Sequence, residues 1–298
     1  MKSLISILCL GAVIVAGCTT DRAPDMEALA SDIDSLVTSH PGARVSVSII
    51  DPAHDLTWHR QGDELYHAAS TMKVPVLIEL FRQVEAGRFS LDDEIILRNE
   101  FSSIVDGSPY SIEDDSDDAI YTQLGQPMSL RQLAYNMTTV SSNLATNLLI
   151  DVLDADSVQA TSEQLGTRLM QTIRGVEDLK AFEQGLSNRA TSADLALLMD
   201  RLRTGTAVSP AADSTMRGIL LDQVFNSMIP NGLPAGTQVA HKTGSITEIH
   251  HDAAIVYPAD GEPYVLVIMT GGVADQEESS ALGSAIAARV HQELRGTP

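Results

Sequence analysis

Hydrophobic residues recur at two different spacings along this chain, and the spacing changes between its ends and its middle. Near the N-terminus, residues 26–40 place Leu29 and Ile33 one helical turn apart, which is typical of an amphipathic helix. Residues 43–50 then alternate between apolar and polar side chains, as a strand does, and residues 56–60 could pair beside them as an antiparallel neighbour. This end of the chain therefore predicts a helix followed by two strands of a sheet.

The middle of the chain has the spacing of helices. A strongly apolar run at residues 71–87 ends at Gly87, and Pro75 suits the first turn of a helix, so this helix should begin near Ser70. Residues 100–128 are acidic and irregular, which predicts a solvated loop. Further helices are predicted over residues 129–140, 141–153, 157–166, 191–205 and 209–223.

The C-terminal third of the chain returns to strands. Residues 238–245, 251–258 and 263–272 predict three successive strands, and residues 276–296 predict a closing amphipathic helix. The links between these strands have the length of hairpins, so we expect antiparallel pairing.

Strands at both ends and helices between them predict the fold class. We expect an α/β (α+β) fold, in which a mainly antiparallel sheet is built from both termini and has flanking helices, with an all-α domain inserted between. The domain would span residues 26–298, with its α/β part at about 26–69 and 205–298 and its all-α part at about 70–204.

Composition and charge narrow the possible partners. The chain has 298 residues, enough for one large domain with a hydrophobic core, and its formal net charge is −21. Nucleic acids and anionic membrane surfaces attract basic patches, so a chain this acidic is a poor candidate for binding either. We therefore expect no nucleic-acid partner, and we expect a monomer.

The first residues have the pattern of an export signal. Lys2 is followed by an apolar run and then by small residues that lead to Cys18, so residues 1–17 are predicted to be a signal peptide. This ending resembles the lipobox of bacterial lipoproteins, whose cysteine is lipidated. Cys9 lies inside the signal, which leaves Cys18 without a disulfide partner. We expect a periplasmic lipoprotein anchored to the membrane, with residues 18–25 as its tether; ordinary secretion is the alternative.

One short stretch, residues 67–76 (HAASTMKVPV), places Lys73 three residues after Ser70 in a chain that has only four lysines among its 19 basic residues. Positions i and i+3 of a helix share a face, so the amine can approach the hydroxyl. A serine becomes a good nucleophile when a base takes its proton, and a lysine with a lowered pKa can be that base, whereas arginine stays protonated. Helix N–H groups near Ser70 would stabilise an oxyanion. The pair therefore indicates nucleophilic catalysis.

Two further fragments follow in order along the chain. Residues 141–143 (SSN) open a predicted helix, and residues 241–245 (HKTGS) lie on a predicted strand. With Ser70 and Lys73, they make residues 26–295 resemble the class A β-lactamase and penicillin-binding-protein superfamily of serine hydrolases. The resemblance implies the β-lactamase/transpeptidase fold, which agrees with the predicted elements.

The resemblance also implies a role for each residue of the first two fragments. Ser70 would be the acylated nucleophile, and Lys73 would be its partner in proton transfer. Ser141 matches the hydroxyl that relays protons, and Asn143 matches the amide that faces the substrate and Lys73. Ser142 occupies the position at which the family usually has an aspartate.

The third fragment would bind substrate. By the same resemblance, Lys242 and Thr243 would hold the substrate carboxylate, a task for a fixed cation and a hydroxyl. Gly244 belongs to the same substrate-binding strand. The backbone N–H of Ser245 would complete an oxyanion hole with that of Ser70.

One region departs from the family pattern. Class A enzymes have a loop glutamate, followed four residues later by an asparagine, that positions the water for deacylation. Glu177 lies about where that glutamate should, but the residue four positions later is Ala181. Glu183 is a second candidate for the base, and Asn188 could supply the amide. The alternative is that Glu177 only forms an ion pair with an arginine of its own loop, at position 174 or 189.

The resemblance implies an exported hydrolase that opens β-lactam rings through an acyl-enzyme at Ser70. The substrate would be a small β-lactam or a peptide of the D-Ala-D-Ala type. Two alternatives stay open: a DD-peptidase that acts on cell-wall peptides, and a sensor that stays acylated. We expect no cofactor and no metal site, since His250 and His251 do not share a helix face and have no ligand cluster beside them.

Overall fold

A five-stranded antiparallel sheet forms the base of the molecule. The structure, a computed structural model, describes residues 23–296. The order of the strands across the sheet is β2-β1-β11-β10-β9, so the first two strands of the chain pair with the last three. The predicted sheet built from both termini is therefore confirmed. Its strands are β1 (Arg44–Asp51), β2 (Leu56–Arg60), β9 (Gln238–Ile246), β10 (Ile249–Tyr257) and β11 (Tyr264–Gly271).

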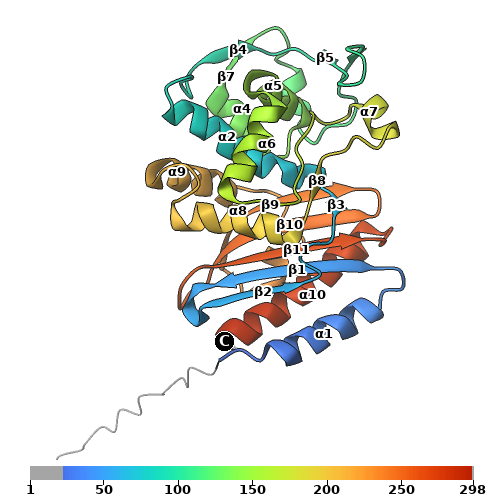
Figure 1. Cartoon of the computed structure of the whole chain (residues 1–298), viewed down its shortest axis with the longest axis vertical. Helices are drawn as coiled ribbons and strands as arrows, with labels where there is room; N and C mark the ends of the chain where they lie inside the picture. Colours follow the sequence, from blue (N-terminus) through green and yellow to red (C-terminus); the bar gives the residue numbers. More distant parts are fainter. Residues whose placement is uncertain (1–22, 297–298) are drawn as a thin grey trace, which may run out of the picture.

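Helices cover both faces of this sheet, as Figure 1 shows. Two helices, α1 (Met26–Thr38) and α10 (Gln276–Arg295), lie side by side on one face, where they enclose a core of aliphatic side chains. Helix α8 (Ser192–Thr204) lies on the opposite face. Strand β11 is buried along its whole length because both of its faces are covered. This burial explains why its sequence is continuously apolar rather than alternating.

The helical part of the molecule stands on the α8 side of the sheet (Figure 1). It shares one continuous hydrophobic core with that face of the sheet. The helices predicted from the sequence are found there, together with short elements that the sequence did not predict. Its helices are α2 (Lys73–Glu85), α3 (Asp118–Tyr121), α4 (Leu130–Thr139), α5 (Asn143–Leu153), α6 (Ala155–Leu165), α7 (Leu179–Glu183) and α9 (Pro210–Leu221).

Several two- and three-residue strands and short 3₁₀ turns lie between the longer elements. They form three separate two-stranded ladders, β3 with β8, β4 with β7 and β5 with β6. One of these ladders, β5 with β6, lies within the acidic region at residues 100–128 that was predicted to be a loop. The strands are β3 (Tyr66–His67), β4 (Glu94–Ile96), β5 (Phe101–Ser102), β6 (Pro109–Tyr110), β7 (Pro127–Ser129) and β8 (Arg189–Ala190), and the 3₁₀ turns are η1 (Pro52–His54), η2 (Ala69–Met72) and η3 (Pro230–Gly232).

The helix predicted to begin near Ser70 begins three residues later in the structure. Ser70 lies in the 3₁₀ turn η2, and the α-helix α2 begins at Lys73. Ala69 has a φ of 45°, a left-handed conformation, and its N–H donates to Nδ1 of His67 over 3.0 Å. This bend tightens the chain before α2 and sets the direction from which Ser70 projects.

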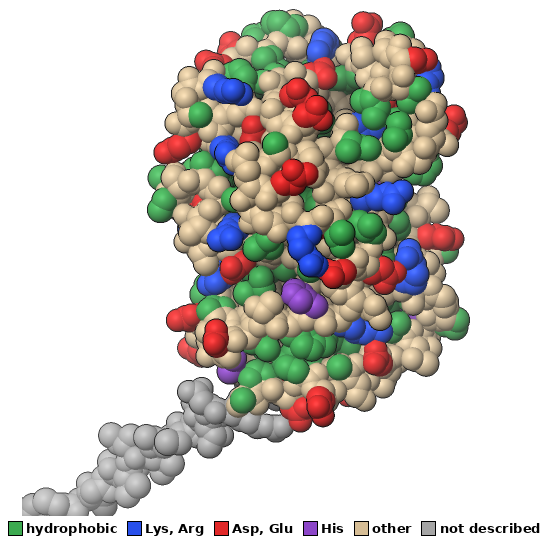
Figure 2. Space-filling model, in the orientation of Figure 1, with side chains coloured by type: hydrophobic (Ala, Val, Ile, Leu, Met, Phe, Trp, Pro, Cys, Tyr) green, Lys and Arg blue, Asp and Glu red, His purple; other side chains and the backbone are tan. Residues whose placement is uncertain are grey.

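The predicted signal peptide, residues 1–17, and the predicted lipidation site, Cys18, lie outside the described residues. Within residues 23–296, no helix combines the length and the hydropathy needed to span a bilayer. Acidic side chains are spread over the face of the molecule in Figure 2 rather than gathered in one patch, so the net charge of −21 does not by itself mark a site on this face.

Strand β9 packs directly against η2, and this contact depends on a glycine. A Cβ atom at Gly244 would lie 2.9 Å from the backbone nitrogens of Ser70 and Thr71. We predict that Gly244→Ala lowers the free energy of unfolding by about 1–3 kcal/mol, since backbone has to move to relieve the overlap. The matched control is Gly218→Ala on α9, where an added Cβ meets no atom within 4 Å. It should be neutral or stabilising by up to ~1 kcal/mol.

Urea unfolding of both variants measures this difference. Equal stabilities of the two variants would contradict the close contact between β9 and η2.

Candidate active site

Ser70 opens into a cavity of about 530 Å³ between the helical part and the edge of the sheet. Three elements meet there: η2 carries Ser70, the N-terminus of α5 carries Asn143, and β9 carries Thr243 and Gly244. Ser141 lies just before α5 and also lines the cavity. The three fragments found in the sequence are therefore brought together in space.

Lys73, the first residue of α2, is almost fully buried, with 1% of its surface exposed. Its Nζ lies 2.6 Å from the carbonyl oxygen of Ser141, 2.9 Å from Oδ1 of Asn143 and 3.2 Å from Oγ of Ser141. The first two partners can only accept hydrogen bonds, whereas a hydroxyl can also donate. An ammonium at Nζ would donate to all three oxygens. A neutral amine would keep the first two bonds and could accept a hydrogen bond from the hydroxyl of Ser141, so these partners suit both protonation states.

The surroundings of Lys73 shift its protonation equilibrium toward the neutral amine. Burial lowers the pKa of Lys73 from its ordinary value of 10.5 to about 7, although the negative charges of Asp115 and Glu177 act in the opposite direction. An amine with this pKa is present in both protonation states near neutral pH. Lys73 can therefore accept and return a proton, which is the property that the sequence analysis required of it.

Lys242 is a second buried amine in contact with the same hydroxyl. Its Nζ donates to Oγ of Ser141 over 2.9 Å and to the carbonyl oxygen of Thr243 over 2.9 Å. Burial, and next the charge of Lys73, lower the pKa of Lys242 well below its ordinary value. Because like charges in a buried site repel, a positive charge on one lysine makes it harder for the other to be charged. The hydroxyl of Ser141 connects them and provides a route for a proton.

Glu177 also reaches this cluster, through Asn143. Its Oε1 accepts from Nδ2 of Asn143 over 2.8 Å, and its Oε2 accepts from the backbone N–H groups of Glu113 and Asp114 over 2.9 and 3.4 Å. Among the described residues, no ion pair joins Glu177 to Arg174. Arg189 likewise forms none with it. The alternative in which Glu177 only anchors an arginine of its loop is therefore not what the structure has.

The other residues of this loop that were considered for deacylation, Glu183 and Asn188, form no hydrogen bond with the cluster among those of the described residues. Asn188 is buried and its amide binds backbone groups of the loop itself: Oδ1 accepts from the N–H groups of residues 173 and 174, and Nδ2 donates to the carbonyl oxygen of Arg174. Glu183 is exposed at the end of α7. Ala181 is buried in the same helix. Glu177 is thus the loop carboxylate that reaches the cluster, and the amide beside it belongs to Asn143.

The sequence analysis missed two features of the site. The acidic segment at residues 113–118 is part of the cavity wall, and Asp115 accepts hydrogen bonds from the start of α5. Behind β9, the buried His241 pairs with Asp252 over 2.8 Å. A run of six polar, mostly acidic residues does not reveal which carboxylate turns inward, and the pairing of His241 with Asp252 depends on the register of β9 and β10.

Three of the seven non-glycine residues with positive φ in the described part of the chain lie at this site. Ala69, Ser141 and Glu177 have φ values of 45°, 59° and 60°, a region that residues other than glycine rarely adopt. Each such residue costs on the order of 1–3 kcal/mol and persists only where surrounding contacts hold it. At Ser141, the contacts with Lys73 and Lys242 are such a restraint.

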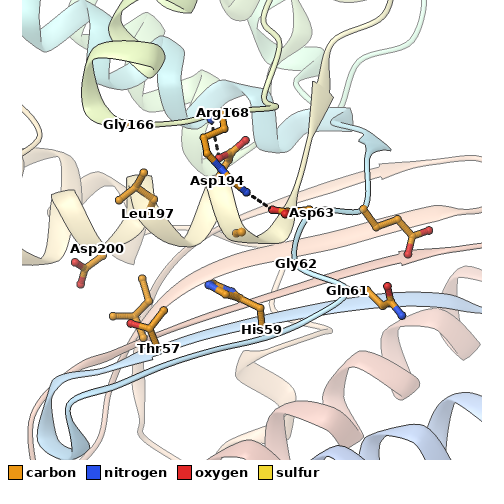
Figure 3. A pocket seen from close by; sticks show the side chains of 13 residues that line it. Thr57, His59, Gln61, Gly62, Asp63, Gly166, Arg168, Asp194, Leu197 and Asp200 are labelled. Atoms are coloured by element: carbon orange, nitrogen blue, oxygen red, sulfur yellow. Dashed lines mark hydrogen bonds and ion pairs between the residues drawn. The ribbon is translucent and has the colours of Figure 1, made fainter.

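A second cavity, of about 860 Å³, lies on another part of the molecule, between β2 and α8 (Figure 3). Its lining comes from β1, β2, the segment at residues 61–64 that follows β2, residues 166–168 and α8. Arg168 points toward Asp63, with which it forms an ion pair over 2.6 Å. Asp194 accepts three backbone N–H groups of the loop and is fully engaged. This larger cavity contains none of the motif residues, so the chemistry is assigned to the cavity at Ser70.

Comparison with known proteins agrees with this arrangement. A family model described as the β-lactamase enzyme family matches residues 28–294, which is nearly the whole described chain. The chain belongs to the β-lactamase enzyme family. The family and the fold expected from the sequence are thereby confirmed, and the protein is a class A β-lactamase-like serine hydrolase.

Individual relatives within the family are distant. A β-lactamase of Rhodobacter capsulatus is 26% identical over 247 residues, which cover 80% of this chain and 79% of that protein. The crystal structure of a β-lactamase from Sphaerobacter thermophilus has a TM-score of 0.80 at 26% identity and covers 92% of this chain and 99% of its own. A variant of PBP-A, seen as an acyl-enzyme complex with penicillin G, has a TM-score of 0.79 at 26% identity. The match covers 91% of this chain and 98% of that one.

The need for a titratable amine at position 73 is testable by substitution. We predict that Lys73→Arg lowers the rate of acylation at Ser70 by at least ~10²-fold, because arginine keeps a positive charge but cannot accept a proton. Lys180→Arg is the matched control: Lys180 is partly exposed and pairs with Asp106, which arginine can also do. Stopped-flow measurement of acylation, with circular dichroism to verify folding, gives the comparison. Acylation of Lys73→Arg at the rate of the control would show that Lys73 acts only as a fixed cation.

Proposed function

We propose that this protein hydrolyses β-lactams through an acyl-enzyme at Ser70. The observation that carries the proposal is a cavity lined by Ser70 and Ser141, in which the hydroxyl of Ser141 is bound by the buried amines of Lys73 and Lys242. The similarity to β-lactamases and to an acyl-enzyme complex with penicillin G supports the same substrate class.

Acylation would begin when Ser70 gives its proton to neutral Lys73. The serine oxygen then forms a bond with the lactam carbonyl carbon, and the backbone N–H groups of Ser70 and Ser245 stabilise the negative charge on the carbonyl oxygen. The carbon–nitrogen bond of the ring breaks next. Its nitrogen receives the proton from Lys73, relayed through the hydroxyl of Ser141.

The substrate itself would prepare Lys73 for this step. A β-lactam usually has a carboxylate, which we propose that Lys242 and Thr243 bind. An anion beside Lys242 favours the charged form of that amine, and a charged Lys242 disfavours a second charge on Lys73. Substrate binding would thus shift the shared proton away from Lys73 at the moment when Lys73 has to act as a base.

Deacylation would use Glu177. A water molecule within reach of this carboxylate attacks the ester carbon and gives its proton to Glu177. The bond between the carbon and the oxygen of Ser70 then breaks, and Ser70 takes the proton back. Asn143 donates to the carboxylate and holds it at the cluster.

A second function is favoured by one observation: Glu177 has no asparagine of its own loop beside it. Position 181 is a buried alanine, and the amide of Asn188 is occupied by backbone groups. A water held by fewer partners would attack slowly, and the acyl-enzyme would persist. The protein would then be a DD-peptidase acting on cell-wall peptides or a β-lactam sensor, with the same acylation chemistry at Ser70.

We also propose where the protein acts. Export through residues 1–17, followed by lipidation of Cys18, would anchor a monomeric domain at the membrane on the periplasmic side. The support is the sequence pattern alone. Radiolabelled palmitate incorporated into the parent but not into Cys18→Ser would establish the anchor, and equal labelling of both would exclude it.

Steady-state hydrolysis distinguishes the proposed functions. For a β-lactamase, the parent protein should turn over many equivalents of a chromogenic cephalosporin, and mass spectrometry of a trapped sample should place the adduct on Ser70. Release of a single equivalent would favour the peptidase or sensor. An adduct elsewhere, with none on Ser70, would refute the assignment of the nucleophile.

Glu177→Gln tests the deacylation step separately. This change keeps the shape of the side chain but removes the base, so we predict a stoichiometric burst followed by a stall while acyl-enzyme accumulates, with turnover reduced by ~10²-fold or more. The matched control is Glu183→Gln, since Glu183 is an exposed glutamate nearby in the chain. It should turn over like the parent. A Glu177→Gln variant as active as the control would mean that the base is another group.

A further inference from the structure

The N-terminus of α5 is capped by a carboxylate that comes from outside the motif at residues 141–143. Oδ1 of Asp115 accepts from the backbone N–H of Asn143 over 2.9 Å, and Oδ2 accepts from the backbone N–H of Leu144 over 2.8 Å. These N–H groups lie in the first turn, which has no intrahelical acceptors and carries the positive end of the helix dipole. Oδ2 also accepts from the hydroxyl of Tyr121 over 2.9 Å. Three donors thus hold the carboxylate of Asp115 in place.

Asn143 is the residue that this cap holds in place. Its side chain bridges the two ends of the catalytic cluster, accepting from Nζ of Lys73 over 2.9 Å and donating to Oε1 of Glu177 over 2.8 Å. Its backbone N–H is bound by Asp115. A change in the position of Asp115 would therefore move both of these contacts together.

Ser142 does not bind the N–H groups of Asn143 and Leu144, which Asp115 binds. It stands where the family usually has an aspartate, and as the N-cap of α5 its hydroxyl accepts from the N–H of Ala145 over 3.3 Å. The hydroxyl of Ser142 is also 3.4 Å from Oδ2 of Asp115. The carboxylate that the sequence motif lacks is therefore present in space, on the acidic segment.

We propose that Asp115 is a positioning residue for acylation at Ser70: it fixes the N-terminus of α5, and with it Asn143, and it supplies a negative charge to the site. The inference rests on the proposed function, since acylation is its readout. Three charged groups face Lys73 from the elements packed around it: Asp115 of the acidic segment, Glu177 of its loop and Lys242 of β9.

The sign of the charge effect follows from these groups. The charge of Asp115 raises the pKa of Lys73, in opposition to burial, which dominates. Acylation needs neutral Lys73, so its rate rises with pH through the pKa of Lys73. Removing the charge of Asp115 lowers that pKa, and the rising limb of the pH profile should move to lower pH. A merely structural loss would reduce the rate at every pH without moving the limb.

The experiment measures kcat/KM for acylation against pH in the parent, in Asp115→Asn and in a matched control. We expect Asp115→Asn to lower the plateau of kcat/KM about tenfold or more, since a displaced Asn143 disturbs the geometry of the cluster, and to move the rising limb to lower pH. Asp118→Asn, an exposed aspartate of the same acidic run, should keep the parental profile. An unmoved limb in Asp115→Asn overturns the inference.

A second substitution tests whether the carboxylate itself is what matters. Ser142→Asp restores a carboxylate at the same helix N-terminus. In the Asp115→Asn background it should recover acylation at least severalfold, whereas in the parent it places two carboxylates together and should lower acylation. An equal loss in both folded backgrounds overturns the inference. If the double variant does not fold, the pH profile of Asp115→Asn decides alone.

Failure of the proposed function is distinguishable from failure of this inference. A fluorophosphonate reacts with an activated serine through attack of Oγ on phosphorus and loss of fluoride, whatever the natural substrate is. If the parent reacts with this probe at Ser70 but with no β-lactam, the proposed function is wrong and the same pH profiles are measured by phosphonylation. Profiles of Asp115→Asn and the parent that coincide with this probe also overturn the role of Asp115.

Discussion

The burial of two lysine amines around one hydroxyl is the constraint on which the rest of the site depends. Lys73 and Lys242 each have 1% of their surface exposed, and both contact Oγ of Ser141. An isolated buried charge costs several kcal/mol, and two like charges cost more. The site lowers this cost by favouring the neutral form of an amine, and a neutral amine beside Ser70 is a base. Burial of the amines is therefore unfavourable for stability, but it is also what lowers the pKa of Lys73 and lets it act as a base.

The fold maintains this arrangement by bringing together three segments that are distant in the sequence. The sheet positions β9, and through Gly244 this strand lies against the 3₁₀ turn that carries Ser70. The core of the helical part holds α2 and α5, so Lys73 and Asn143 meet at their ends. Left-handed backbone at Ser141 directs its hydroxyl between the two amines. Mobility of any one segment would separate the amines from the hydroxyl and would allow water to hydrate them.

Much of the fold could be predicted because its periodicity is unambiguous. Strands β1, β2 and β9 to β11 and the long helices follow directly from apolar spacing, and Ser70, Lys73 and the fragments at 141–143 and 241–245 are local in sequence. Asp115 could not be predicted, because nothing in an acidic run specifies which side chain turns inward. The 3₁₀ turn at Ser70 was also missed, since the conformation of Ala69 depends on its contact with His67. The amide beside Glu177 is supplied by Asn143 rather than by a residue of its own loop, and only the packing of that loop against α5 reveals this.

The pKa of Lys73 in the unliganded protein tests the central claim most directly. Nuclear magnetic resonance of protein with ¹³C-labelled lysine follows the Cε shift of each lysine with pH, and the signal absent from Lys73→Arg assigns this residue. Burial predicts a midpoint at about 7 for Lys73, with the partly exposed Lys180 as the internal reference. A midpoint near the ordinary value of 10.5 would contradict the account, because Lys73 would then be charged at neutral pH and could not accept the proton of Ser70.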